Sequence, residues 1–265
     1  MRFSPEWSFE QSECTGCGIC EKACPSDAIV ILNGYPFFTI DKCIACGHCG
    51  AYCPENCFGF DRVPDPEDIC SSEKYLKLLE ARRSIRHFST ITPSEEEINN
   101  ILSVLSQSPT GVNKQGITVR VVRGAEAVEE LLRPVKKLLR ILDCTGISFL
   151  IGKLTGRSAY LRKLRHGRDI IFRGAPVVLY FHVPRSNITG RTDGIIAAAT
   201  VMHHAVTLGY GTLWNGIAEK LYQLLPSWHS SDTKGTRLTA VLCIGYPEMA
   251  PEWKVPPRDY QIIHD

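Results

Sequence analysis

One cysteine pattern, written twice, limits what the start of this 265-residue chain can fold into. The spacing C-x2-C-x2-C-x3-C-P begins at Cys14 and again at Cys43, so a shift of 29 residues (43 − 14) lays one copy on the other. Three thiolates at this spacing surround one corner of an iron–sulfur cube, while the fourth, before the proline, ligates the other cluster. The repeat therefore predicts two [4Fe-4S] clusters with crossed ligation.

The crossed pattern divides the eight repeated cysteines into two sets of four. The first set combines three cysteines of the first copy with the last of the second copy: Cys14, Cys17, Cys20 and Cys53. The second set is the reverse: Cys24, Cys43, Cys46 and Cys49. Cys57 aligns with Ala28 of the first copy, so we place it outside the ligand sets, as a small buried side chain beside a cluster.

Zinc and disulfides are the two other uses of such cysteines. Structural zinc also takes paired CxxC knuckles, but it has no use for three cysteines in C-x2-C-x2-C register followed by Cys-Pro. Disulfides are disfavoured because dense, close spacing in a chain without a secretory signal indicates reduced thiols. Iron–sulfur ligation is therefore the preferred interpretation of the repeat.

Length and composition bound the rest of the architecture. The chain is 44% hydrophobic, enough for one small domain and one full-sized core. We predict domains at 1–62 and 73–265, joined by a proline-containing, acidic linker at 63–72. The stretch MRFSPEWSFE lacks the apolar core of a signal peptide, and no apolar run reaches the roughly 18 residues of a membrane span. We expect a cytoplasmic protein with no membrane partner.

Charge is divided unevenly along the chain. Residues 1–70 carry 4 Lys/Arg and 11 Asp/Glu, a net charge of −7 (4 − 11), and the remainder carries 26 and 17, a net charge of +9 (26 − 17). An acidic first part is a poor partner for nucleic acid, and the basic part has no nucleic-acid motif. We expect no nucleic-acid partner, and opposite fields that favour contact between the two parts.

Hydrophobic periodicity after residue 70 predicts helices alternating with strands. Helices are expected over 73–84, from Pro93 to about 107, over 125–142 with a kink at Pro134, and over 193–211. Strands are expected over 117–122, 175–183 and 238–247, the last two of them buried. The basic segment 141–173 has no clear pattern, and the proline-rich tail from Pro251 is expected to be extended.

Five motifs in this part follow one another in a fixed order: EARRSIRHF at 80–88, SPTGVNKQ at 108–115, RGAPVVLYF at 173–181, DGIIAAATVMHHAVTLGYGTLWNG at 193–216 and LTAVLCIGYPE at 238–248. In that order they resemble the nitroreductase family of FMN enzymes over about residues 76–260, and residues 9–60 resemble the bacterial two-cluster ferredoxins. The resemblance implies an α+β protein. A small two-cluster ferredoxin-like domain would precede an FMN domain whose central, mainly antiparallel sheet is flanked by helices, in a dimer.

The resemblance also implies which residues hold FMN. The first motif would supply donors to the phosphate and to the electron-rich edge of the ring, from Arg82, Arg83, Ser84 and Arg86. The second motif would reach the flavin of the other subunit of a homodimer, through Pro109, Thr110, Gly111, Asn113 and Gln115. The turn that faces flavin N5 through its backbone would be Trp214, Asn215 and Gly216. Lys254 and Arg258 are further phosphate candidates, although they lie farther apart than the family's basic pair.

No residue is assigned to catalysis, and the acceptor is not readable from the sequence. The principal hypothesis is an oxidoreductase that passes single electrons from a ferredoxin-type donor through the clusters to FMN, which reduces a nitroaromatic, quinone or activated alkene. The alternatives are an electron-transfer module without catalysis, and a flavoprotein that oxidises NAD(P)H and exports electrons through its clusters. No Rossmann fingerprint follows a strand, so NAD(P)H would have to bind directly over the flavin.

Overall fold

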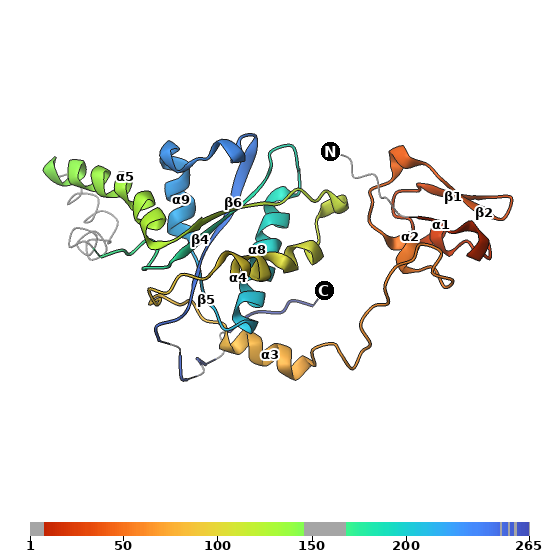
Figure 1. Ribbon diagram of the computed structural model, residues 1–265, viewed down its shortest axis with the longest axis horizontal. Helices are drawn as coiled ribbons and strands as arrows, with labels where there is room; N and C mark the ends of the chain where they lie inside the picture. Colours follow the sequence, from red (N-terminus) through yellow and green to blue (C-terminus); the bar gives the residue numbers. More distant parts are fainter. Residues whose placement is uncertain (1–7, 146–167, 250, 254, 257–258, 265) are drawn as a thin grey trace. The chain divides into compact units, whose positions relative to one another are not determined.

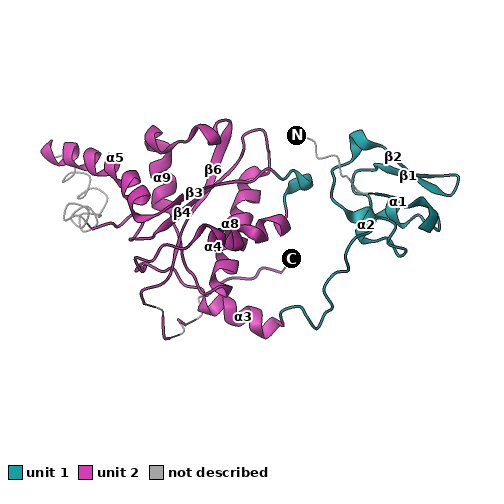
Figure 2. Ribbon diagram, in the orientation of Figure 1, with its two compact units in different colours: residues 1–70, 110–115 teal, residues 71–109, 116–265 magenta. Residues whose placement is uncertain are grey.

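The computed structural model describes residues 8–145, 168–249, 251–253, 255–256 and 259–264, and these form two compact units (Figure 2). Unit 1 comprises residues 1–70 together with the short segment 110–115, and unit 2 comprises residues 71–109 and 116–265. Most of the patternless basic segment 141–173 lies outside the described residues. Within the described ranges, no helix has the length and apolarity to cross a membrane.

Unit 1 repeats its backbone as it repeats its cysteines. Its part before residue 71 contains the helices α1 (Ile19–Ala23) and α2 (His48–Ala51) and the 3-10 turns η1 (Gln11–Glu13) and η2 (Ile40–Lys42). Each second member starts 29 residues after the first (48 − 19 and 40 − 11). Left-handed backbone recurs at the same interval, in the pairs Gly16 and Ala45, Gly18 and Gly47, and Asp27 and Asn56. The sequence repeat is therefore also a structural repeat.

An antiparallel hairpin and a small aromatic core complete unit 1. Strands β1 (Ile29–Leu32) and β2 (Tyr35–Phe38) pair across the Asn33–Gly34 turn, whose two positive φ values suit the twist of a hairpin (Figure 1). Phe9, Phe38 and Phe58 meet with ring centroids 5.3–6.1 Å apart. A domain of this size has too few residues for a larger core, so these rings serve as its core.

Unit 2 is built on one antiparallel sheet. Its strands are β3 (Thr118–Arg123), β4 (Val177–Pro184), β5 (Gly211–Trp214) and β6 (Thr236–Gly245), in the spatial order β3-β4-β6-β5. Val177–Val183 of β4 is buried along its whole length because both faces of the sheet are covered. The predicted strands at 117–122, 175–183 and 238–247 correspond to β3, β4 and β6.

Helices cover the two faces of this sheet. On one face α4 (Glu95–Leu102) and α8 (Gly190–Thr207) pack on alternate strand residues that include Leu179 and Leu242. On the other face α5 (Ala125–Cys144) and α9 (Gly216–Leu224) enclose a core that includes Tyr180 and Trp228. A further helix, α3 (Ser72–Ala81), starts from its N-cap Ser71 (Figure 1). The predicted sheet flanked by helices is confirmed.

Three details differ from the sequence prediction. The helix expected over 193–211 ends at Thr207, because Gly209 adopts a left-handed φ of 85° that stops it, and β5 follows. Pro93 lies before α4 and not in its first turn, since Ser94 is the N-cap and forms a capping box with Glu97. The helix α4 itself ends at Leu102, and its last expected turn is the 3-10 turn η3 (Ser103–Gln107). The remaining short turns are η4 (Gly111–Asn113), η5 (Pro226–Trp228) and η6 (Ser231–Thr233).

Candidate functional site

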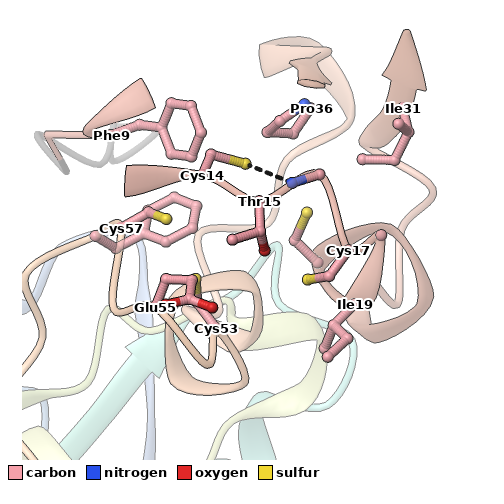
Figure 3. Close-up of a pocket in the computed structure, with 14 residues that line it drawn as sticks. Phe9, Cys14, Thr15, Cys17, Ile19, Ile31, Pro36, Cys53, Glu55 and Cys57 are labelled. Carbon is pink, nitrogen blue, oxygen red and sulfur yellow. Dashed lines mark hydrogen bonds between the residues drawn. The ribbon is translucent and has the colours of Figure 1, made fainter. Parts of the chain in front are cut away.

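The structure gathers the first predicted set of cysteines around one pocket of unit 1, here called the first cysteine pocket. Its lining contains all four members of that set: Cys14, Cys17, Cys20 and Cys53. Apolar side chains such as Phe9, Ile19 and Ile31 form much of the remaining wall (Figure 3). The backbone N–H of Gly16 donates to Cys14 Sγ over 3.5 Å. A side chain at residue 16 would not fit, because its Cβ would lie 2.4 Å from the carbonyl oxygen of Gly34.

The second predicted set lines another pocket of unit 1, here called the second cysteine pocket. Its four cysteines are Cys24, Cys43, Cys46 and Cys49. Donors approach two of these sulfurs: the Ala45 N–H lies 3.3 Å from Cys43 Sγ, and the Ala28 N–H lies 3.2 Å from Cys24 Sγ. The Ser26 hydroxyl lies 3.6 Å from Cys24 Sγ. The second cysteine pocket therefore has more of the described donors directed at its sulfurs than the first, where the Gly16 N–H approaches Cys14.

The chemistry of both pockets fits a four-iron cluster. Each offers the four thiols of one predicted set, an apolar wall and a backbone N–H directed at sulfur, which are the groups that hold and tune such clusters. Burial raises the pKa of the Cys49 thiol to about 11 and also raises that of Cys20, so a bound metal is needed to hold these residues as thiolates. Burial acts the same way on Cys24, but the hydrogen bonds from Ser26 and Ala28 leave its pKa below the usual value. The ligand role of each cysteine stays a prediction.

Cys57 lines the first cysteine pocket as a fifth thiol (Figure 3). Only 3% of its surface is exposed, and burial, followed by a hydrogen bond with Cys53, raises its pKa to about 12. Its carbonyl accepts from the Glu10 N–H, as the carbonyl of Ala28 accepts from the Thr39 N–H one repeat earlier. Cys57 thus occupies the buried place of Ala28, and its position outside the ligand set stays a prediction.

In unit 2 two of the predicted flavin segments, 82–86 and 214–216, are brought together by strand β5. Ser84 forms a parallel bridge with Thr212 of β5, and the Ile85 N–H donates to the Thr212 carbonyl over 2.9 Å. Thr212 is two residues before Trp214, so this pairing brings the arginine motif next to the 214–216 turn. Arg82, Arg83 and Ser84 are half-buried and Arg86 is exposed. Arg82 also caps the end of α3.

The turn from Trp214 to Gly216 is fixed by the side chain of Asn215. Its Oδ1 accepts from the Ala218 N–H over 2.9 Å, and its Nδ2 donates to the Ile171 carbonyl over 2.8 Å. This buried side chain is used as the N-cap of α9, so Asn215 has only its backbone to offer a ligand. Gly216 opens α9, where helix N–H groups lack intrahelical acceptors. Apart from its chain neighbours and its own helix backbone, no described atom lies within 4 Å of the place where a Cβ at Gly216 would stand.

A buried hydroxyl between these segments adds to their fit with a polar ligand. Thr212 is 1% exposed, and its Oγ1 has no hydrogen-bond partner among the described residues. A buried hydroxyl without a partner costs free energy, and such groups in folded proteins usually meet water or a ligand. The arginines, the Gly216 backbone and this hydroxyl are groups that suit an anionic, planar cofactor such as FMN, and their role in holding it stays a prediction.

The third predicted flavin segment, Thr110–Gln115, belongs to unit 1. Within that unit, Asn113 Nδ2 donates to the carbonyl oxygens of Ile44 and Ala45 over 3.1 and 2.7 Å. Asn113 Oδ1 accepts from Gln115 Nε2 over 2.8 Å. Val112, Asn113 and Gln115 all have positive φ, a conformation that costs energy in residues other than glycine and concentrates at functional sites. Lys254 and Arg258 lie outside the described residues.

Comparison with known protein families assigns both parts of the chain. A family model described as "Nitroreductase family" matches residues 79–246, and a model described as "4Fe-4S dicluster domain" matches residues 6–54. The chain belongs to the nitroreductase family. The family predicted from the five motifs is therefore confirmed, as is the ferredoxin-type segment that precedes them. No curated protein matches this nitroreductase-family sequence.

Solved structures of other nitroreductases share the fold. One, a nitroreductase with bound FMN from Desulfitobacterium hafniense DCB-2, is 23% identical, with 72% of this chain and 97% of that chain covered and a TM-score of 0.52. Another, a nitroreductase with bound FMN from Bacteroides fragilis NCTC 9343, is 18% identical, with 71% and 98% covered and a TM-score of 0.52. At these identities the likeness shows the fold alone.

Two residues of the candidate sites, one in the second cysteine pocket and one at the candidate flavin site, were not predicted from the sequence. Ser26 follows the Cys-Pro of the first repeat and stands where the second repeat has Glu55, so the difference between the repeats was the available signal. Thr212 carries no comparable signal, because only its pairing with Ser84 brings it to the site.

Proposed function

We propose that this protein is an iron–sulfur and FMN-dependent oxidoreductase. It accepts single electrons from a ferredoxin-type donor, passes them through two [4Fe-4S] clusters to FMN, and delivers them in pairs to an organic acceptor such as a nitroaromatic, a quinone or an activated alkene. FMN supplies the conversion between one-electron and two-electron chemistry, which clusters alone lack. This conversion explains the joining of the two modules in one chain.

One observation carries the proposal: each cysteine pocket takes three cysteines from one repeat and the fourth from the other. A chain with two such pockets can store and move electrons one at a time. The nitroreductase-family domain then provides the site at which a pair of electrons leaves. In unit 2, Arg82 and Arg86 would contact the anionic groups of the flavin, and the Gly216 N–H would donate to the edge of its ring.

The contacts of Asn113 support a link between the flavin and the clusters. The segment 110–115 is expected to contact FMN, and in unit 1 it is bonded to Ile44 and Ala45, which lie between Cys43 and Cys46. Two hydrogen bonds thus connect a segment predicted to contact flavin with a loop predicted to bind a cluster. This favours the second cysteine pocket as the place from which the flavin receives electrons.

The direction of electron flow is tested by anaerobic reduction of the purified protein. Reduced ferredoxin is compared with NADH and NADPH while the flavin absorbance is followed. Rapid bleaching by ferredoxin and steady turnover of a quinone or nitroaromatic support the proposal. Rapid bleaching by NAD(P)H alone would favour the reverse flow, and flavin reduction without turnover of any small acceptor would favour an electron-transfer module.

The protein is expected to be a homodimer with FMN at the interface. The helix α8 exposes Ile195 and Ile196, each with 37% of its surface accessible, as expected for a helix that packs on a second copy. Light scattering of the FMN-loaded protein should therefore give the mass of two chains. A stable monomer that retains FMN would contradict the interface site.

Replacing Arg82 by alanine should weaken FMN binding about tenfold or more, because a charge-assisted hydrogen bond is worth roughly 1.5–3 kcal/mol. The measurement is the FMN dissociation constant from flavin fluorescence on reconstitution. Lys77→Ala is the matched control, since Lys77 is an exposed cation of the same segment whose described ion pair is with Glu73 of its own helix. Equal affinity in Arg82→Ala and in Lys77→Ala would show that the phosphate lies elsewhere.

Replacing Ser26 by alanine should lower the midpoint potential of the cluster in the second cysteine pocket. The hydroxyl lies 3.6 Å from Cys24 Sγ, and a hydrogen bond to a ligating sulfur favours the reduced, more negative cluster. A redox titration followed by electron paramagnetic resonance measures both clusters in one sample. Thr15→Ala, in the wall of the first cysteine pocket, is the control. An unchanged second potential in Ser26→Ala would rule out this role of the hydroxyl.

A further inference from the structure

A third, larger pocket opens in unit 2 where several chain segments end. It has a volume of about 700 Å³, within the usual range for small-molecule sites. Its walls come from the end of β4, the start of β6, the last turn of α9, the residues between η5 and η6, and η6 itself. The cross-strand pairs His182–Leu238 and Pro184–Thr236 bring the two strand ends together. We call it the basic pocket.

The ionisable side chains that line the basic pocket are basic or aromatic, and none of those described is a carboxylate. Three permanently charged side chains line it, Arg185, Lys234 and Arg237, and two imidazoles join them, His182 and His229. Arg185 and Lys234 are exposed, so their charged groups are available at the surface. Such a lining attracts anions.

His182 is a buried polar group of the wall with unused hydrogen-bonding capacity. It is 1% exposed, and its Nδ1 lies 3.1 Å from Thr236 Oγ1. The Thr236 hydroxyl donates to the Thr233 carbonyl over 2.6 Å, so its oxygen accepts from His182 Nδ1–H. Nε2 is then left as an acceptor, and it has no partner among the described residues. Burial, followed by the charges of Arg120 and His229, lowers the pKa of His182 to about 4, which keeps the ring neutral.

Arg237 has unused capacity as well. Its Nη2 donates to the Asn187 carbonyl over 2.8 Å, while its buried Nε has no partner in the described part of the chain. An aromatic pair lies beside these groups, because the rings of Tyr222 and His229 stack with centroids 4.4 Å apart. His229 Nε2–H donates to the Tyr222 carbonyl, which fixes its ring at the end of α9. The pocket therefore combines cations, a buried acceptor and a flat aromatic wall.

The basic pocket is separate from the proposed flavin site. None of its lining residues belongs to the segments 82–86, 110–115 or 214–216. The helix α9 connects the two places, with Gly216 in its first turn and Tyr222 near its last. Six residues of helix separate them, about 9 Å along the axis at 1.5 Å per residue.

We propose that the basic pocket binds a phosphorylated small molecule of nucleotide size. Its phosphates contact Arg185 and Lys234 at the mouth, and a part that carries a hydrogen-bond donor lies at the wall formed by His182 and the Tyr222–His229 pair. Two exposed cations suit a multiply charged anion, a volume near 700 Å³ admits a whole nucleotide, and the neutral imidazole accepts from a hydroxyl or amine.

The test uses calorimetric titration of the FMN-loaded protein with ATP, inorganic pyrophosphate and adenosine at fixed ionic strength. One ATP per chain is expected, with pyrophosphate weaker and adenosine weakest. Arg185→Gln and Lys234→Gln should each weaken ATP binding about tenfold, the usual effect of losing a charge-assisted contact. Lys220→Gln is the control, because it removes the same charge from the exposed side of α9 and does not line the pocket. The FMN content of each variant is measured to show that the flavin site is intact.

Each outcome decides the proposal. Loss of ATP affinity in Arg185→Gln and Lys234→Gln but not in Lys220→Gln supports it. Absence of ATP and pyrophosphate binding at millimolar concentration overturns it, as does equal weakening in all three variants. Equal affinity for ATP and pyrophosphate would overturn the nucleotide-sized ligand, and a His182→Gln variant checks that part separately, since it should weaken ATP more than pyrophosphate. Arg185 and Lys234 are exposed, so their variants remain informative if His182→Gln does not fold.

Discussion

Cys17→Ser combined with Cys46→Ser should yield a protein whose flavin is no longer reduced by ferredoxin. One ligand would be lost from each predicted cluster, because Cys17 lines the first cysteine pocket and Cys46 the second. Without clusters, single electrons have no path to FMN, and the rate should fall by orders of magnitude. The measurement is anaerobic rapid mixing of reduced ferredoxin with wild type and variant, followed at the flavin band.

Two controls separate loss of the path from loss of the flavin site. Dithionite should still reduce the flavin of the double variant, and the FMN content should be unchanged. Cys144→Ser, at an exposed thiol of α5 that lines neither cysteine pocket, should behave as wild type. Equal reduction rates in the double variant and wild type would mean that the clusters are not on the path and that the N-terminal part has another role.

Cys24→Ser should remove the cluster of the second cysteine pocket and leave the first. Cys24 belongs to the first repeat by sequence, but it lines the pocket of Cys43, Cys46 and Cys49. Iron and acid-labile sulfide should therefore fall from about eight to about four per chain, as expected for two four-iron clusters of which one is lost. Anaerobic metal analysis with Mössbauer or paramagnetic resonance spectra measures the loss and identifies the remaining cluster.

The reciprocal variant provides the matched control. Cys53→Ser should remove the cluster of Cys14, Cys17 and Cys20 and keep the other one. If Cys24→Ser instead removed the cluster of its own repeat, the crossed assignment would be wrong. Zinc without sulfide in the wild-type protein would refute both clusters together.

Much of the fold could be predicted because its signals are local. The strands β4 and β6 contain continuous apolar runs, which indicate strands covered on both faces. The sequence SEEE at 94–97 contains the Ser94 and Glu97 of the capping box of α4. The cysteine spacing predicts sets that the structure brings to two separate pockets. Family motifs then placed Arg82–Arg86 and Trp214–Gly216 in one candidate site, and the Ser84–Thr212 bridge puts them side by side.

Features that depend on pairing between distant segments could not be predicted. The strand β5 has four residues, too few for an alternating pattern, and it exists because it pairs with the end of β6. The turn at Asn215 was predicted to face the flavin through its backbone, but the use of the buried Asn215 side chain to cap α9 could not be predicted. The basic pocket depends on the register of β4 with β6, which places Arg185 and Arg237 at one end of the sheet from positions 52 residues apart (237 − 185).

The repeated backbone of unit 1 has a consequence for how such a protein can change over time. Equivalent left-handed residues, 29 positions apart, give the two cysteine pockets nearly interchangeable frames. The two cysteine pockets therefore differ through individual side chains, such as Ser26 against Glu55 and Ala28 against Cys57. Natural selection can raise or lower either reduction potential by single substitutions at these positions without rebuilding the domain. The preferred direction of electron flow is then a trait that evolves separately from the fold.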